Sequence, residues 1–596
     1  MTIDLTSLQA PRAAEVELGL TKFLDPLRIP PVRKPHDSLE VTMRATHAQL
    51  HSELPPTPVW AYDGHFPGPT IEVRSGRRLR VAWRNRITGA YPATAVNLPS
   101  ADMTPGPGRD GATPRATVEA LPPWTVVHLH GARTGGGNDG WTENAVLPGL
   151  AQLSEYPNDQ RSTTLWYHDH AMAVTALNVM AGLAGMYIIR DDEEAALHLP
   201  CGDHEIPLIV CDRNLDTDEN DEYTGDLLYK KAILPPQSVP NPMVVVQPFS
   251  GPFTLVNGVI WPHLDVEARW YRFRLVNASN LRPYNFQLRD EDGALVHGAL
   301  HQIGSDGGLL PAPVALDELT LQPGERADVL IDFGAFRGTS LTLVDTLPAP
   351  TGPGTSTANP DVMQFRVRSW PVHDHFRLPA TLSPSFKRLT HDNLPKHEHR
   401  WLALTLITGK HPELWEMVEI DDDEVPAKLP VDGIVQVKLP GGPVKTLKRV
   451  SRDFKDAVNF YVEQDGWEQW KIINLSPALL PIPHPIHVHL VQFQALSRDN
   501  YDISTFDSSV GGTSTPITHT SAGTLSPGEQ GWKDTIRVGP KELVSIGAQF
   551  GGGSGRFMFH CHILEHEDEG MMRTFVVMPE EVMALDPNMH RPHHDH

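Results

Sequence analysis

The segment Phe559-His560-Cys561-His562, followed by His566 and Met571, is the most informative stretch of this chain. A type 1 (blue) copper site takes two histidines and one cysteine, with a weak axial methionine. Cys561, His566 and Met571 supply three of these four ligands, and the two histidines beside the cysteine remain for a second metal site. Successive side chains of a strand point to opposite faces. The cysteine would therefore face one metal and its neighbours another, with covalent bonds joining the two sites. This arrangement indicates electron transfer.

Three other histidine clusters can supply the missing ligands. Each contains a His-x-His pair with apolar or aromatic flanks, which favours a strand over a solvated tail. In a strand, such a pair puts both imidazoles on one face, within reach of one metal or two neighbouring metals. The clusters are Trp124–Gly131 (W-T-V-V-H-L-H-G, with His128 and His130), Trp166–His170 (W-Y-H-D-H, with His168 and His170) and Pro483–Leu490 (P-H-P-I-H-V-H-L, with His484, His487 and His489). The whole set is ten histidines, one cysteine and one methionine.

Two other His-x-His pairs act as controls for chance occurrence. His373-Asp374-His375 and His397-Glu398-His399 lie in a polar stretch without an apolar strand pattern. A lone pair of this kind is more often a surface feature than a metal site. We therefore expect both pairs to lie in a solvated linker.

The four motifs, their order and their division between the two ends of the chain resemble the multicopper oxidases of the laccase type. The similarity is to the bacterial group of spore-coat laccase, bilirubin oxidase and phenoxazinone synthase. The resemblance implies four copper ions. The type 1 copper would be held by His484, Cys561 and His566, with Met571 axial, and the type 2 copper by His128 and His487. The type 3 pair would take His130, His168, His170, His489, His560 and His562.

The resemblance also implies roles in catalysis. At the type 1 site, His566 or His484 would present its ring edge to the substrate, and electrons would leave through Cys561 to the neighbouring histidines. Met571 as the axial ligand predicts a moderate reduction potential. Asp139 and Glu567 match acidic residues that this group places near the three-copper centre, where they would relay protons to reduced oxygen. An equally weighted alternative is that both only hydrogen-bond the copper histidines.

A repeated strand pattern predicts three domains. Gly76–Asn85 recurs in outline as Ala268–Asn277 and again as Gly466–Asn474, each an alternating strand that ends at Asn. Copies at nearly equal spacing imply domains of one kind, and short alternating strands with Pro/Gly turns make each an antiparallel β-sandwich. The fold class is therefore all-β, and the resemblance implies three cupredoxin-like Greek-key domains. We place them at residues 1–200, 201–370 and 371–596, and we expect residues 366–396 to form the link into the third domain.

The ligand motifs lie only in the first and third repeats. We therefore expect the three-copper centre between these two domains. The middle repeat would hold them apart and help to wall the substrate pocket.

Composition limits the other possibilities. The formal net charge of -23 argues against nucleic-acid binding. No apolar run approaches the roughly 18 residues of a membrane span. Met1–Leu20 lacks a basic start and an apolar core, so no secretory signal is visible. With only three cysteines, the chain fits a reducing compartment, and we expect a cytoplasmic location. Cys201 and Cys211 either pair with each other or are both small buried hydrophobes.

The expected activity is the one-electron oxidation of o-aminophenols or phenols, coupled to the four-electron reduction of O2 to water. The run G-A-R-T-G-G-G-N-D-G-W-T-E-N-A after the first ligand pair is most similar to phenoxazinone synthase. The partners would then be O2 and small phenolic or aminophenolic substrates. Two alternatives remain open, namely a bilirubin oxidase-like enzyme and a non-catalytic copper or electron-transfer protein.

Overall fold

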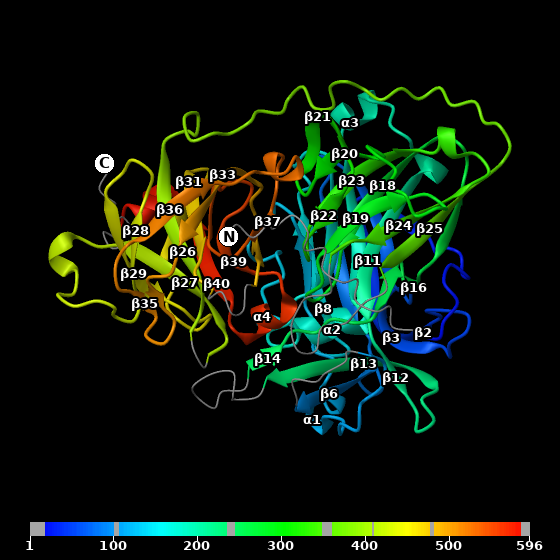
Figure 1. Cartoon of the computed structure of the whole chain (residues 1–596), viewed down its shortest axis with the longest axis horizontal. Helices are drawn as coiled ribbons and strands as arrows, with labels where there is room; N and C mark the ends of the chain where they lie inside the picture. Colours follow the sequence, from blue (N-terminus) through cyan, green and yellow to red (C-terminus); the bar gives the residue numbers. More distant parts are fainter. Residues whose placement is uncertain are drawn as a thin grey trace, which may run out of the picture.

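The structure is a computed structural model that describes residues 18–99, 106–234, 245–347, 360–407, 410–476 and 482–585. Strands dominate the described chain and form three successive β-domains (Figure 1). The predicted all-β class is thus confirmed. Most of the N-terminal segment considered for a signal lies outside the described residues.

The first domain is a sandwich of two mixed sheets. In spatial order, the first sheet contains β1 (Val32–Arg33), β4 (Gly68–Arg74), β10 (Ala184–Arg190), β9 (Thr163–Asp169) and β7 (Val127–His130). The second contains β3 (Thr57–Tyr62), β2 (Ser38–Ala48), β5 (Leu79–Asn85) and β8 (Ala151–Tyr156).

The second domain repeats this arrangement with a larger sheet. The larger sheet contains β16 (Val259–Ile260), β15 (Phe253–Val256), β11 (Glu205–Arg213), β18 (Trp270–Asn277), β23 (Arg326–Asp332), β20 (Leu300–Ser305) and β21 (Gly308–Leu316). The smaller contains β17 (His263–Val266), β25 (Asp361–Val367), β24 (Ser340–Asp345), β19 (Tyr284–Arg289) and β22 (Leu319–Leu321).

In the third domain, one layer closes on itself as a barrel. The barrel contains β26 (His397–Leu406), β27 (Pro412–Glu419), β29 (Val444–Ser451), β28 (Ile434–Lys438), β36 (Ile517–Ala522), β33 (Phe493–Asp502), β38 (Glu542–Gln549) and β31 (Trp467–Asn474). The other layer contains β30 (Phe460–Glu463), β40 (Met572–Met578), β39 (Gly555–Cys561), β32 (His484–Val488) and β37 (Thr535–Val538). A separate pair is formed by β34 (Phe506–Asp507) and β35 (Gly512–Thr513).

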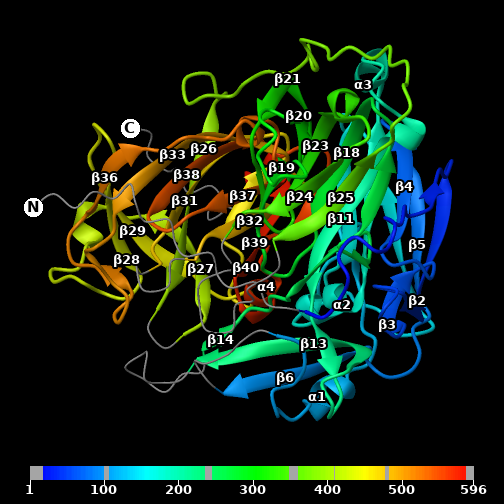
Figure 2. The same cartoon turned by 45° about the vertical axis from the view of Figure 1, so that its right-hand side comes forward.

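A further small sheet joins the first two domains. Its strands are β12 (Leu215–Thr217), β13 (Tyr223–Leu234) and β14 (Val245–Gln247), with β6 (Ala93–Pro99) of the first domain running parallel to β13. It lies below helices α2 and α4 in Figures 1 and 2. The helices are all short: α1 (Ala116–Glu119), α2 (Thr175–Ala181), α3 (Asp192–Ala196), α4 (Leu564–Glu569), α5 (Glu580–Met583), η2 (Gly202–His204), η4 (Gly334–Phe336), η5 (Asp422–Glu424) and η6 (Gly528–Gln530).

Alternating burial explains why these sequences form sandwiches. Along β5, Leu79, Val81 and Trp83 are buried, while Arg80 between them is exposed. Each fully buried large apolar side chain contributes about 1.5–3 kcal/mol relative to an exposed one. One core of buried apolar residues lies in the first domain and continues into the second, while the second and the third domain each have a further core.

The three predicted repeats share one local structure. The repeats become β5, β18 and β31, which end at Asn85, Asn277 and Asn474. Each of these asparagines is fully buried. Each side-chain amide donates to two main-chain carbonyls across the sandwich, and each side-chain oxygen accepts the amide two residues further on. The same residue thus closes the end of the same strand three times.

The direction of the strands corrects one expectation. The domains were expected to be antiparallel, but β2 pairs with β5, β11 with β18 and β26 with β31 in parallel. Alternation of apolar and polar residues reports which face of a strand is buried, not the direction of its neighbours. The sheets are therefore mixed.

Two local expectations were also wrong. His397 and His399 lie at the start of β26, not in a linker, because the apolar half of this strand begins only at Trp401. His373 and His375 do lie in a stretch without regular strand or helix, as expected.

Cys201 is exposed and Cys211 buried, and neither forms a disulfide. Only Cys211 is therefore a small buried hydrophobe.

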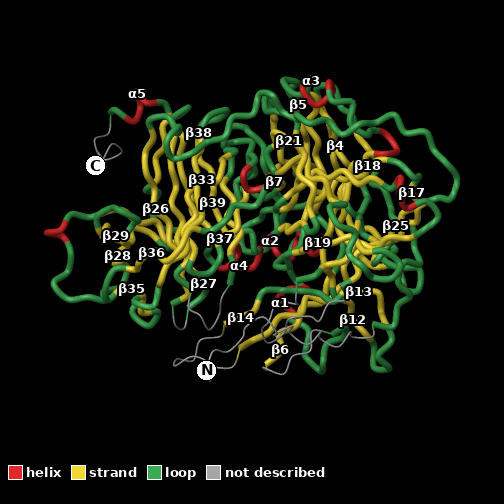
Figure 3. Tube along the Cα trace, turned by 45° about the horizontal axis from the view of Figure 1, so that its top comes forward, coloured by secondary structure: helices red, strands yellow, loops and turns green. Residues whose placement is uncertain are grey.

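The connection between the second and third domains is long and irregular. It follows β25 and crosses the molecule before entering β26 (Figure 1). The strand layers of the third domain stand beside those of the other two (Figure 3). Within the described ranges, no helix is long and apolar enough to cross a membrane. The exact domain boundaries given above remain predictions.

Candidate metal centre

Two strand pairs bring the histidine motifs together. In the first domain β7 runs antiparallel to β9, and His128 lies opposite His168. In the third domain β32 runs antiparallel to β39, and His487 lies opposite His560. Strands β7, β9 and β32 were predicted from the apolar flanks of their histidine pairs. Histidine rings of the two sheets contact each other, so that histidines from distant parts of the chain share one buried space.

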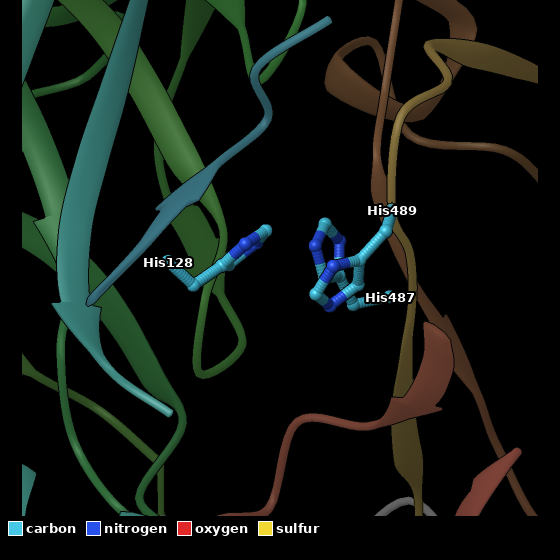
Figure 4. Close-up of side chains that lie close together, drawn as sticks. All are labelled: His128, His487 and His489. Atoms are coloured by element: carbon cyan, nitrogen blue, oxygen red, sulfur yellow. The ribbon is translucent and has the colours of Figure 1, made fainter. Parts of the chain in front are cut away.

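The imidazoles of the two domains interdigitate at this contact. His128 stacks on His489 with ring centroids 3.9 Å apart, and His130 stacks on His487 at 3.6 Å. Figure 4 shows His128 pointing from one domain towards His487 and His489 on the other. The site thus lies between the first and third domains, as the distribution of motifs predicted.

The candidate ligands form groups in which each residue offers one ligand atom and these atoms lie within 4.8 Å of one another. Six of the histidines form two groups of three. In one group three Nε2 atoms lie close together: His560 Nε2 is 3.2 Å from His170 Nε2 and 3.1 Å from His489 Nε2. Ligand atoms about 2 Å from one tetrahedral ion lie roughly this far apart. Four groups contain candidate ligands alone: His130, His168 and His562; His170, His489 and His560; His128, His487 and His489; and His484, Cys561 and His566. A fifth group places Asp534 with His130 and His487.

Unpartnered nitrogens show that these residues fit metal ions. Among the described residues, His128 Nε2, His130 Nδ1, His168 Nε2 and His487 Nε2 are buried without any hydrogen-bond partner. A buried polar atom without a partner carries a substantial desolvation cost. Burial lowers the pKa of His128 well below its usual value, with a further contribution from neighbouring histidines. Burial likewise lowers the pKa of His130, His168 and His487, so these four imidazoles are held neutral, which is the form that binds a metal.

The second nitrogen of most of these rings is fixed by the protein. His128 Nδ1 donates to the Asp139 carbonyl at 2.7 Å, and His168 Nδ1 donates to the Asp169 carbonyl at 2.8 Å. His487 Nδ1 donates to the carbonyl of Asp534 at 2.8 Å. Such contacts set the tautomer and the ring orientation of a metal-binding histidine.

The group around Cys561 has the composition of a type 1 site. Cys561 Sγ lies 3.4 Å from His484 Nδ1 and 3.8 Å from His566 Nδ1. Met571 is fully buried, and its carbonyl accepts the Cys561 amide at 2.9 Å. Burial raises the pKa of the Cys561 thiol, so a bound cation would be needed to hold the thiolate. Burial also lowers the pKa of His484 to about 3.

A short helix connects these ligands. The strand β39 ends at Cys561, α4 carries His566, and Gly570 with φ 136° ends the helix so that the chain returns to Met571. Only glycine adopts this φ without strain. On the same helix, Asp568 accepts the amides of Thr175 and Ala176 at 3.0 and 2.9 Å, at the start of α2. The segment with the cysteine is therefore fastened to the first domain just after His168 and His170.

The two predicted acidic residues both touch the histidines. Asp139 Oδ2 lies 2.7 Å from His489 Nδ1, and burial raises the pKa of Asp139 to about 8. Glu567 lies 3.3 Å from His170 Nδ1 and 3.2 Å from His560 Nδ1. Burial alone would raise the pKa of Glu567, but these two histidines hold it below its usual value. Both positions suit a proton relay and also suit plain hydrogen bonding to the ligands.

Sequence reasoning missed two residues beside the site. Asp534 Oδ1 lies 3.0 Å from His130 Nε2, and Arg326 of the second domain donates to the same carboxylate. Neither residue belongs to a recognisable motif. The one feature of the sequence that could have pointed to Asp534 is the charged pair Lys533-Asp534 directly before the apolar strand β37. The second domain therefore does more than separate the other two.

One candidate ligand approaches the surface. His566 is 3% exposed, more than any of the other eleven. Near it, Glu569 pairs with His411 at 3.0 Å and with Lys231 at 3.5 Å. Among the described residues, the two cationic groups around His566 thus share a carboxylate. This pairing leaves no strong excess of one charge beside the ring.

Comparisons with known proteins agree with this geometry. Two family models described as multicopper oxidase match the chain, one over residues 429–581 and the other over 43–123 and 114–194. A laccase of Bacillus subtilis is 38% identical over 575 residues, covering 93% of this chain and 98% of the relative. A bilirubin oxidase of Albifimbria verrucaria is 29% identical, covering 96% and 84%. The crystal structure of a laccase from Pediococcus acidilactici has a TM-score of 0.64 at 23% identity, covering 94% and 95%, and supports the fold.

Proposed function

Because this chain belongs to the multicopper oxidase family, whose members bind four copper ions, we propose that it oxidises o-aminophenols and related phenols with O2 as the acceptor. The twelve residues of the predicted set would hold the copper. Bound copper supplies one-electron redox chemistry and a store of electrons for the reduction of O2 to water. The chain itself supplies the electron-transfer path between the copper sites, the side chains that donate or accept protons, and the residue that contacts the substrate.

The observation that carries the proposal is the geometry of β39. Cys561 joins the group with His484 and His566, while His560 and His562 belong to the two other histidine groups. One continuous backbone thus connects the buried group around Cys561 to two buried histidine groups. An electron carrier with a type 1 site alone would need neither of those two groups. The geometry therefore favours an oxidase over a carrier.

The substrate contact is assigned to His566. Its ring is the least buried of the candidate ligands, and the charges near it are paired with each other. A neutral aromatic ring is better suited to such a surface than a highly charged molecule. The likeness of the loop after His130 to phenoxazinone synthase makes o-aminophenols the first choice.

A bilirubin oxidase-like activity is the second candidate. It is supported by the relative of that name, which aligns with nearly the whole chain. Lys231 beside His566 would be the natural contact for a carboxylate-bearing substrate, if Glu569 released it.

Asp139 and Glu567 are proposed to hand protons to the buried site. Asp139 contacts His489, and Glu567 lies between His170 and His560. Both can therefore hold or release a proton within one hydrogen bond of a ligand ring.

We keep a cytoplasmic location as a further proposal, to be tested by fractionation of the host cells.

The test is oxygen uptake by fully copper-loaded protein with 2-aminophenol, a methoxyphenol and bilirubin in turn. We expect the fastest uptake with 2-aminophenol, together with a coloured coupling product. Uptake with bilirubin alone would establish the second candidate, and no uptake with any of the three would favour the carrier. The matched control is Cys561→Ser, which should remove the blue absorption and the oxygen uptake together.

A further inference from the structure

A buried cluster of charged residues lies where all three domains meet. Its members are at most 6% exposed, and none belongs to the proposed ligand set. Asp306, Glu325 and Arg326 come from the second domain, and Lys533 and Asp534 come from the third. Burying so many charges is unfavourable unless their geometry is well satisfied. Stabilisation of the fold alone therefore does not explain this cluster.

Arg326 contacts all three domains with one side chain. Its Nε donates to the Thr164 carbonyl of the first domain at 3.0 Å, and Nη1 donates to the Gly324 carbonyl of its own domain at 2.9 Å. Nη1 also donates to Asp534 Oδ1 of the third domain at 2.7 Å, while Nη2 contacts Asp534 Oδ2. A guanidinium fork suits such a two-point contact with a carboxylate, and a lysine cannot reproduce it.

Asp534 in turn holds a histidine from each of the two ligand-bearing domains. Its Oδ1 lies 3.0 Å from His130 Nε2, and its main-chain carbonyl accepts His487 Nδ1 at 2.8 Å. His130 is thereby left with Nδ1 free, whereas His128 and His487 are left with Nε2 free. The carboxylate thus turns His130 the opposite way from the other histidine of its own motif.

Two glycines make room for this arrangement. A Cβ on Gly131, where φ is +88°, would lie 2.6 Å from Asp534 Oδ2 and 2.7 Å from Arg326 Nη2. A Cβ on Gly324, where φ is +84°, would lie 2.8 Å from His562 Cδ2. Contacts this short do not occur at real Cβ atoms. The glycine of H-L-H-G therefore allows the ion pair to approach the ligand strand.

We propose that Arg326 and Asp534 form a positioning pair through which the second domain fixes the metal-facing nitrogen of His130 and holds His130 against His487. The two rings stack at 3.6 Å with 15° between their planes. The inference rests on the proposed function only in taking both histidines as copper ligands. It gives the middle domain a direct role in assembling the buried copper centre.

The decisive variant is Asp534→Asn, which keeps the side-chain shape and removes the charge. Loss of a partner that orients a metal-binding histidine typically weakens metal affinity by about 10- to 100-fold. We expect this loss only at the three-copper centre. The measurements are copper per chain, the type 2 copper spectrum by electron paramagnetic resonance, and the blue absorption of the type 1 site, each during titration with a copper chelator. The blue absorption should persist while the other copper leaves at lower chelator concentration.

The matched control is Asp345→Asn, which breaks a buried Arg282–Asp345 pair of 2.9 Å in the second domain, away from the ligands. It should leave the copper titration unchanged. A second variant, Arg326→Lys, keeps the positive charge and loses the fork, and we expect a smaller loss of the same copper. This variant decides the matter if Asp534→Asn does not fold.

Three results would overturn the inference. The first is a chelator titration curve and a type 2 copper spectrum that match the unmodified protein in both Asp534→Asn and Arg326→Lys. The second is loss of the blue absorption at the same chelator concentration as the other copper, which would mean a purely structural role. The third is an equal effect of Asp345→Asn. Failure of the proposed function is distinguishable, because the unmodified protein would then lack the type 2 signal or the oxygen uptake.

Discussion

At the scale of single residues, the ligand histidines are defined by the partners of their second ring nitrogen. Main-chain carbonyls hold Nδ1 of His128, His168 and His487, whereas carboxylates contact His130 and His489. A carbonyl can only accept, so it fixes the tautomer without adding charge. A carboxylate adds charge and can also take up a proton, so the two kinds of partner give the rings different properties.

Asp139→Asn tests whether proton uptake at one of these partners matters. Asparagine keeps the shape and can still accept from His489 Nδ1 with its oxygen, but it cannot relay a proton. We expect copper content and blue absorption to remain and turnover to fall by about 100-fold, as for loss of a general acid–base group. Copper analysis and oxygen uptake measured on the same sample check this. Unchanged turnover with normal copper would leave Asp139 with hydrogen bonding alone.

Met571→Leu tests the axial position of the type 1 site. Met571 is fully buried beside Cys561, and leucine fills a similar volume without a sulfur atom. Removing a weak electron-donating ligand should raise the reduction potential of the type 1 copper, since the axial ligand tunes it. A redox titration followed by the blue absorption measures the change. An unchanged or lowered potential would argue against axial ligation by this methionine.

At the scale of elements, the asparagine at the end of the repeated strand fastens each sandwich. Asn277 is fully buried, donates to the carbonyls of Arg282 and Leu321, and accepts the amide of Ser279. Because β5, β18 and β31 all end this way, the motif belongs to the domain fold and not to the metal site. The second domain, which carries none of the proposed ligands, uses it equally.

Asn277→Ala should therefore lower stability without changing the metal site directly. Three hydrogen bonds are lost and buried groups are left unpaired, which costs on the order of 3 kcal/mol at about 1 kcal/mol each. Thermal unfolding of copper-free protein, followed by circular dichroism, gives the shift of the midpoint. Asn500→Ala is the control, because its bond to Ser521 is exposed. Equal midpoints for the two variants would contradict the fastening role.

At the scale of the whole molecule, the buried histidines make the copper-free protein sensitive to acid. Burial lowers the pKa of His484 to about 3, and burial with the adjacent His170 lowers that of His168 to about 3. In the unfolded chain a histidine titrates near 6.5. The unfolded state therefore binds more protons below this pH, and stability present above about 6.5 is lost as pH falls towards 3.

We expect each such histidine to lower the free energy of unfolding of the copper-free protein by about 1.4 kcal/mol for each pH unit by which the pH falls within that window. Urea unfolding of chelator-treated protein between pH 7 and pH 4 measures the slope. Copper binds only the neutral rings of the folded protein, so the loaded protein should unfold at higher urea at every pH. A copper-free protein whose stability does not change across this window would contradict the neutral, buried state of these rings.

The ligand inventory and the strands that carry it follow from local sequence. His128 and His130, or His560 and Cys561, sit in short alternating apolar runs, and the period of a strand alone decides which of them share a face. The asparagine-ended repeats likewise predicted three similar domains. Alternation did not report the direction of neighbouring strands, which is why parallel pairs such as β11 with β18 were not foreseen.

By itself, the sequence determined which side chains could bind copper and that they stand on strands, because residue chemistry and the two-residue period are local properties. Only the tertiary structure decided which nitrogen of His130 is free, because the partner of this ring lies far away in the chain, whereas His128 and His168 donate to carbonyls only 11 residues and one residue away. His130 takes its orientation from Asp534, 404 residues later, and Asp534 takes its own from Arg326, 208 residues earlier. No local pattern encodes such contacts, because they exist only once the three sandwiches have packed together.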